Sequence, residues 1–282
     1  MEVSMVSAVM LSGKNNPTLA RDTMFAVVMI VMGGLAGMAL ILGAWRHLQQ
    51  SFNLEGAGAY LSLIVPLAVF SLVLPEFTIA TETATFTTRQ AIFLSVLCVA
   101  LYILFLIIQT MRHKSFFEDS VGGQTHEDLD EGQGIGASLI LLLGALFPVV
   151  ILSKKLAVVL DFGTSRLMLP SALSGVIVAL LILAPEGLSA IQSAWKNQLQ
   201  RSINLLLGSV LATISLTVPA VLTIGLLTHT EVELGLRAQE AILLCVMLTV
   251  SVLTFGSGKT NLLQGAVHLL VFFFWLVLVF GV

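Results

Sequence analysis

The sequence predicts an all-α polytopic membrane protein, and two observations carry this prediction. Apolar residues make up 57% of the 282 residues and charged residues only 10%, with a mean hydropathy of +1.01. This composition is far more apolar than that of a soluble domain. Runs of about 20 apolar residues, the length that crosses a bilayer as a helix, recur along the whole chain. Lipid is therefore the expected solvent for most of the protein.

Apolar length and flanking turn residues predict eight spanning helices and one shorter apolar segment. The shorter segment, residues 3–11, has about half of the length that a bilayer requires. We therefore expect additional sequence before Met1 in the functional protein, with one more helix and the first half of the helix that carries Glu2. The eight spans are predicted at residues 23–44, 59–74, 90–110, 135–152, 171–191, 203–227, 240–255 and 262–282.

One polar segment interrupts the apolar pattern. Residues 112–134 contain six acidic residues among Gly, Gln and His, and they separate residues 1–111 from residues 135–282. A solvated connector explains this composition. The alternative is a low-affinity calcium buffer or sensor, although the acidic spacing fits no EF-hand loop. The net charge of −3 offers no basic surface for nucleic acid.

The two halves repeat the same order of features. Glu2 and Glu186 each lie in an apolar helix, which a polar turn, an arginine (Arg21 or Arg201) and a glycine-bearing helix follow. The helices of Glu2 and Glu186 are expected to run in opposite directions. The pattern is typical of transporters built from two inverted-topology repeats with a cation site at the bilayer midplane. Lys and Arg are nearly even on the two sides, so charge predicts no orientation.

Glu186 is the strongest candidate for a binding residue. A run of apolar residues precedes Pro185, and an ionised carboxylate there costs about 2.5–3.5 kcal/mol, so it indicates ion binding or proton relay. A protonated glutamate that only joins helices is the alternative. Pro185 removes a backbone donor and Gly187 should loosen the helix, so we expect bare carbonyl oxygens beside the carboxylate. With Glu2 facing it, the pair would hold one divalent cation or two protons.

Calcium takes six to eight oxygen ligands, so two carboxylates need further donors. Ser209 and Thr213 share a helix face at i, i+4 spacing, and Gly208 permits close approach of helices. Each hydroxyl has the alternative role of an interhelical hydrogen bond. The polar candidates on this helix are Asn204, Ser209, Thr213, Ser215 and Thr217.

Other motifs carry weaker signals. His268 is a titratable group inside an apolar run, where a packed core histidine is favoured over a proton relay. Residues 256–260, GSGKT, lack the earlier glycine and the strand of a phosphate loop, so nucleotide binding is not expected. The absence of HExxH and GxSxG motifs argues against a zinc protease or a serine hydrolase, and no enzymatic activity is expected.

Residues 185–219, PEGLSAIQSAWKNQLQRSINLLLGSVLATISLTVP, resemble the second signature repeat of the calcium/cation antiporter superfamily, in its calcium/proton exchanger branch of the bacterial ChaA type. The family's acidic residue, AWKN-like turn and GS pair correspond to Glu186, residues 195–197 and residues 208–209. Residues 87–113 look like the last helix before the family's acidic connector. MEVSMVSAVML at the start resembles the first signature repeat from its acidic residue onward.

The resemblance implies Ca²⁺/H⁺ exchange by alternating access, with Glu2 and Glu186 as ligands of the cation and the protons. No cofactor is implied beyond the transported Ca²⁺. We expect a multi-pass protein of the inner (plasma) membrane, and no oligomeric state is predicted. Ile182 and Leu183 stand where the branch has Gly-Asn, and Ala212 stands where it has glutamine. With fewer amide oxygens, Na⁺/H⁺ or K⁺/H⁺ exchange stays an alternative, as does a passive cation channel or a membrane scaffold.

Overall fold

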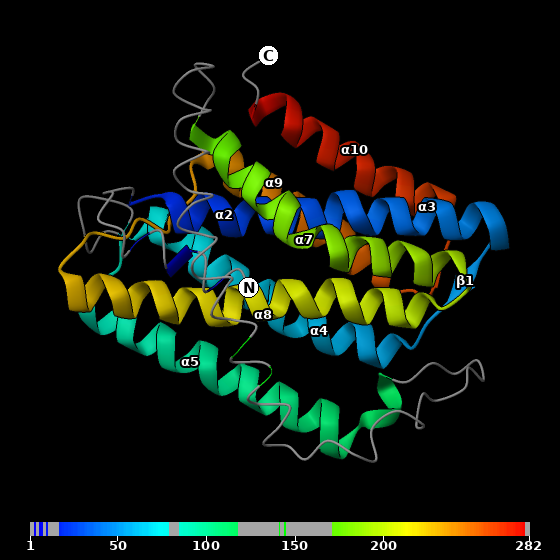
Figure 1. Cartoon of the computed structure of the whole chain (residues 1–282), viewed down its shortest axis with the longest axis horizontal. Helices are drawn as coiled ribbons and strands as arrows, with labels where there is room; N and C mark the ends of the chain where they lie inside the picture. Colours follow the sequence, from blue (N-terminus) through cyan, green and yellow to red (C-terminus); the bar gives the residue numbers. More distant parts are fainter. Residues whose placement is uncertain are drawn as a thin grey trace.

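The computed structural model of the chain describes residues 17–78, 85–117 and 171–279, with single positions at 3, 6, 7, 10, 141 and 144. Nearly all of these residues are helical (Figure 1). The elements, among them π-helices (η1, η2, η4) and 3₁₀-helices (η3, η5), are α2 (Leu19–Val28), η1 (Met29–Leu35), α3 (Ala36–His47), β1 (Gln50–Ser51), α4 (Leu54–Ala68), η2 (Val69–Val73), η3 (Leu74–Phe77), α5 (Thr88–Ile107), η4 (Ile108–Arg112), η5 (Lys114–Phe116), α7 (Ser171–Trp195), α8 (Leu199–Thr228), α9 (Ala238–Phe255), β2 (Lys259–Thr260) and α10 (Leu262–Val279).

Six predicted spans are confirmed as helices long and apolar enough to cross a membrane. A seventh, predicted at residues 171–191, is helix α7. The span predicted at residues 135–152 lies outside the described residues apart from two positions, and so does the connector beyond Phe117. The confirmed spans are Leu19–His47, Leu54–Phe77, Thr88–Arg112, Leu199–Thr228, Ala238–Phe255 and Leu262–Val279.

Several helices begin before their predicted spans, and polar side chains make hydrogen bonds at the first turns of two of them, α4 and α8. Helix α4 starts at Leu54, since the Asn53 side chain accepts hydrogen bonds from the backbone N–H groups of Glu55 and Gly56, a typical N-cap. Helix α8 starts at Leu199, and the Gln200 side chain accepts a hydrogen bond of 2.7 Å from the backbone N–H of Asn53.

The outer helices present apolar side chains away from the protein. On α5 the Phe93 side chain is 70% exposed, and on α10 Leu270 is 67% exposed. The helix Leu19–His47, in contrast, is enclosed by its neighbours. Such an apolar outer surface is what lipid requires and what water disfavours. The exposed faces of α5 and α10 therefore support the membrane-spanning assignment.

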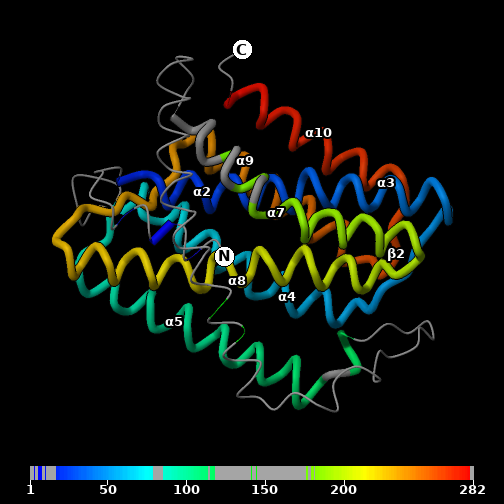
Figure 2. The backbone as a smooth tube through the Cα atoms, in the orientation of Figure 1, coloured from blue at the N-terminus to red at the C-terminus, as the bar shows by residue number. Residues whose placement is uncertain are grey.

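The helices are arranged in two corresponding sets. The two long helices are Leu19–His47 in the first half and α8 in the second. Helix α5 packs along α8, and α10 packs along α3 and η1, while α7 lies between the two long helices (Figures 1 and 2). Helix α5 is the last described α-helix of the first half, and α10 is the last of the second half. The last α-helix of each half therefore packs against the long helix of the other half. This crosswise packing fits the predicted inverted repeat.

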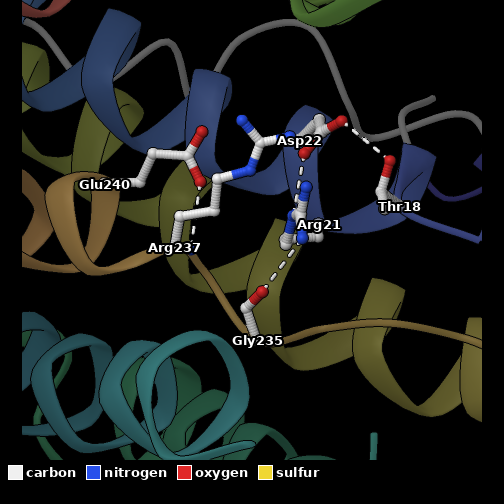
Figure 3. A network of polar contacts seen from close by, with 6 residues as sticks. All are labelled: Thr18, Arg21, Asp22, Gly235, Arg237 and Glu240. Carbon is white, nitrogen blue, oxygen red and sulfur yellow. Dashed lines mark hydrogen bonds and ion pairs between the residues drawn. The ribbon is translucent and has the colours of Figure 1, made fainter. Parts of the chain in front are cut away.

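Hydrogen bonds between the two halves, here called ties, are found at both ends of the helix bundle. At one end, the buried Arg21 donates to Asp22 Oδ1 (2.8 Å, Nε) and to the Gly235 carbonyl (3.0 Å, Nη1), which lies in the link between α8 and α9. Figure 3 shows Arg21 between these two partners, with Thr18 donating to Asp22. A buried guanidinium requires such partners. The start of α2 is thus fastened to the second half.

The corresponding tie lies at the other end of the molecule. Gln50, in the link between α3 and α4, donates to the Ala194 carbonyl (2.8 Å) and to Asn197 Oδ1 (3.0 Å) in the turn between α7 and α8. Gln50 also pairs with Thr260 where β1 meets β2. The second half therefore holds the first turn of α2, and the first half holds the turn that precedes α8.

Candidate cation site

Glu186 and Ser209 meet between α7 and α8. The Ser209 hydroxyl donates a hydrogen bond of 2.6 Å to Glu186 Oε2, a length typical of a charge-assisted bond to a carboxylate. The structure thus brings together two residues that the sequence analysis selected from different helices.

A cavity of about 130 Å³ opens beside this pair. One water needs about 10–15 Å³ of such space, so the cavity has room for an ion with several waters. Glu186 is the one charged residue among its described lining residues, and its side chain is exposed, whereas Thr213 is buried. The lining residues are Val3, Ile182, Glu186, Ser209, Ala212, Thr213 and Leu216.

Helix α7 passes through the site without interruption, which corrects one expectation. Gly187 was expected to loosen the helix, but α7 is helical from Ser171 to Trp195. Gly187 instead allows a close approach, because an added Cβ atom would lie 2.7 Å from Leu35 Cδ2 of η1. Pro185 has no N–H, so it offers no helical donor to the carbonyl of Leu181. The Leu181 carbonyl oxygen therefore lacks its helical hydrogen bond and is available to another donor or to an ion.

The other selected residues separate into two groups. Thr213 lines the cavity together with Ser209, as their shared helix face predicts. Glu2 lies outside the described residues, while Val3, which follows it, lines the cavity. Ser215 and Thr217 are buried and do not belong to the described lining.

Asn204 is not brought to the carboxylate. Its side chain donates to the Phe117 carbonyl (2.6 Å) and accepts from Gln200 (2.9 Å). The bond to Phe117 fastens the segment that follows α5 to α8, and the bond from Gln200 lies within α8. In the part of the chain that the structure describes, Asn204 is therefore an anchor at the start of the connector rather than a neighbour of Glu186.

The described residues contain no group of three or more His, Cys, Asp or Glu side chains that could hold a metal ion. An ion in this cavity would therefore depend on the Glu186 carboxylate, on hydroxyl and carbonyl oxygens and on water. Such a donor set contains only hard oxygen ligands, which suits Ca²⁺ or a monovalent cation better than a soft metal.

One feature of the site could not be selected from the sequence. Leu35 contacts Gly187 from a segment that looked like ordinary apolar helix. His268, predicted as a packed core histidine, is confirmed as one by its burial and by hydrogen bonds at both ring nitrogens.

The fold and the site together define a multi-pass membrane transporter. The chain matches the sodium/calcium exchanger protein family over residues 1–111 and 137–281. The chain therefore belongs to the sodium/calcium exchanger protein family, as the resemblance of residues 185–219 predicted.

Named relatives agree with this membership. The chain is 40% identical to the sodium-potassium/proton antiporter ChaA of Escherichia coli (strain K12), over 100% of this chain and 77% of that protein. It is 24% identical to the Ca²⁺/H⁺ antiporter ChaA of Bacillus subtilis (strain 168), over 84% of this chain and 68% of that one. A crystal structure of the Ca²⁺/H⁺ antiporter protein YfkE has the same fold, with a TM-score of 0.77, 20% identity, and 99% of this chain and 82% of that one covered.

Proposed function

We propose that this chain is a secondary active cation/proton antiporter of the inner (plasma) membrane, in which Glu186 exchanges a proton for a cation by alternating access. The observation that carries the proposal is a single carboxylate, bonded to Ser209 at 2.6 Å, at a small cavity between two long apolar helices. The family and the proton antiporters among the relatives support it.

The site chemistry suits an exchange of this kind. A serine hydroxyl both donates and accepts, so Ser209 can stay bonded to Glu186 with or without a proton on the carboxyl group. A cation that enters favours the ionised carboxylate, and a proton that returns removes the charge that holds the cation. Binding of the two is therefore mutually exclusive, which is the requirement for coupled exchange.

We further propose that Glu2 is the second carboxylate and that Ser209 and Thr213 complete the oxygen set. Residues 1–111 and 135–282 would form the two repeats, with residues 112–134 as their connector. Val3, at the cavity beside Glu186, supports this arrangement because it adjoins Glu2 in the sequence. No catalytic reaction and no cofactor are part of the proposal.

Ca²⁺ is the first candidate cation, since the relative from Bacillus subtilis is named a Ca²⁺/H⁺ antiporter. Na⁺ or K⁺ is the second, and a specific observation favours it. Ala212, which stands where the calcium/proton branch has glutamine, lines the cavity, so one amide oxygen fewer is available for an ion that takes six to eight.

Exchange in proteoliposomes tests the proposal. The purified chain should acidify or alkalinise the lumen only when a cation gradient is present, and Ca²⁺, Na⁺ and K⁺ gradients applied in turn identify the cation. A passive channel would dissipate either gradient alone, and a scaffold would move neither. Either result would reject the antiporter assignment.

A further inference from the structure

A fully buried histidine lies outside the cavity, where α10 packs on the first long helix. His268 Nδ1 lies 2.6 Å from the Met32 carbonyl oxygen, and Nε2 lies 3.1 Å from Thr254 Oγ1. Because a carbonyl oxygen only accepts, Nδ1 carries the hydrogen and donates it to Met32. In the neutral ring Nε2 then accepts from the Thr254 hydroxyl.

Met32 lies in η1, where the helical hydrogen-bond pattern is displaced. In an α-helix the backbone N–H of Ala36 would donate to the Met32 carbonyl, four residues earlier. Here the N–H of Ala36 points to the carbonyls of Val31 and Gly33 instead. His268 therefore supplies a donor to a carbonyl whose α-helical donor is directed elsewhere. A side chain that inserts into the backbone hydrogen bonds of a helix is a recognised cause of local helix distortion. π-Segments of this kind occur mostly as single turns within α-helices.

The contacts around η1 leave little room for another arrangement. A Cβ atom on Gly33 would lie 2.6 Å from Met247 Cε and 2.9 Å from Phe272 Cβ. The π-segment is thus pressed against α9 and α10 on the side that faces His268.

The opposite contact of η1 leads to the candidate site. Leu35, the last residue of η1, lies so close to α7 that a Cβ atom on Gly187 would be 2.7 Å from Leu35 Cδ2. Gly187 directly follows Glu186. If η1 returned to a regular α-helix, the residues that follow the π-segment would rotate about the helix axis by the turn of one residue, about 100°. Such a rotation would turn Leu35 away from Gly187.

We propose that His268 is a positioning residue for the cation/proton exchange. By donating to the Met32 carbonyl it maintains the π conformation of η1, and through Leu35 it sets the position of Gly187 and Glu186 at the cavity. His268 acts through these contacts and touches neither the cation nor the transported proton. This inference rests on the proposed antiport function.

Three substitutions at one position test the role. His268→Asn places an amide N–H near the position of Nδ1, His268→Gln places one near Nε2, and His268→Leu keeps neither. Full-length variants in proteoliposomes are compared by the cation concentration that gives half-maximal proton movement. We expect His268→Leu to raise that concentration about tenfold, as for loss of a buried hydrogen bond, and His268→Asn to restore most of it. His268→Gln should resemble His268→Leu.

Two further variants separate positioning from packing. Thr254→Val removes the partner of Nε2 only and should change the half-maximal concentration by less than about twofold. Leu35→Ala removes the contact to Gly187 without touching His268, so it should reproduce the increase, and it decides the matter where His268→Leu does not fold.

An unchanged half-maximal concentration in both His268→Leu and Leu35→Ala, with only a lower maximal rate, would show that His268 merely packs. Equal rescue by His268→Gln and His268→Asn would also overturn the role of Nδ1. Absence of exchange in the wild-type chain would instead reject the proposed function, and this inference with it.

Discussion

The long helix of the first half, Leu19–His47, and the long helix of the second half, α8, occupy corresponding places but are built differently. The first contains the π-segment η1, is enclosed by its neighbours, and presents glycines to α9 and α10. Helix α8 is α-helical from Leu199 to Thr228, and it carries Ser209 and Thr213 at the cavity.

The difference indicates a division of labour between the halves. Helix α8 contributes oxygens directly, through Ser209, whereas η1 contributes an apolar contact, through Leu35. In the described part of the chain, the polar group bound to the first long helix at η1 is His268, which lies on the far side from the cavity. Under the proposed function, α8 would serve the site by ligation and the first long helix by positioning.

The strongest test of this comparison removes the charge that α8 engages. Glu186→Gln should abolish coupled exchange while helix content and yield stay unchanged, because the amide keeps the shape and loses the titratable proton. Proton flux in proteoliposomes measures the effect, with the exposed Glu231→Gln as a control for loss of one carboxylate. Wild-type exchange by Glu186→Gln would remove Glu186 from the site.

A second test compares the arginines that follow the polar turn in each half. Arg21 is buried and bonded to Asp22 and Gly235, whereas Arg201 is exposed. Arg21→Met should lower the free energy of unfolding by about 1.5–3 kcal/mol, since hydrogen bonds of a charged group are lost. Arg201→Met should stay within about 0.5 kcal/mol of the wild type. Unfolding in detergent measures both, and equal effects would mean that the tie at Arg21 contributes nothing.

A third test adds one methyl group to either side of the site. Gly187→Ala should place Cβ 2.7 Å from Leu35 Cδ2, while Gly208→Ala would meet Tyr60 at 3.6 Å, an ordinary contact. Overpacking of this kind costs about 1–3 kcal/mol, so Gly187→Ala should reduce the exchange rate and Gly208→Ala much less. A larger loss in Gly208→Ala would show that the contact of η1 with α7 is not the tighter constraint.

The smallest effect is expected between the halves. Replacement of residues 118–131 by a Gly/Ser linker of equal length, with Phe117 retained for its bond to Asn204, should leave exchange largely intact. A solvated connector provides reach and little else. Complete loss of exchange, measured in the same vesicles, would identify the segment as a required regulatory element.

Most of the fold could be predicted because apolar length sets the spans. The span predicted at residues 240–255 ends at Phe255, as α9 does. The π-segment could not be predicted, because residues 29–35 have the composition of an ordinary buried helix, and the helix α10 that packs on them lies far away in the sequence. The pairing of Gln50 with Thr260 joins residues far apart in the sequence, which no local pattern encodes.

The candidate site was partly predictable, and helix geometry explains where the prediction stopped. Thr213 follows Ser209 by four residues, about 40° around the helix, so the two share a face. Asn204 precedes Ser209 by five residues, about 140° around, which directs it toward Phe117 instead of the cavity. Leu35 and His268 act through contacts between helices, and these depend on an arrangement that one sequence alone does not specify.

The tie between Arg21 and Gly235 has a consequence for biosynthesis. Its two partners are separated by 214 residues, and at about 5–20 residues per second a ribosome needs roughly 10–40 s to span them. During that interval α2 is already made, and the Arg21 guanidinium has to be solvated by interfacial water or lipid headgroups, as long basic side chains are at helix ends. The contact that fastens α2 to the second half can therefore form only after the link that follows α8 has been synthesised.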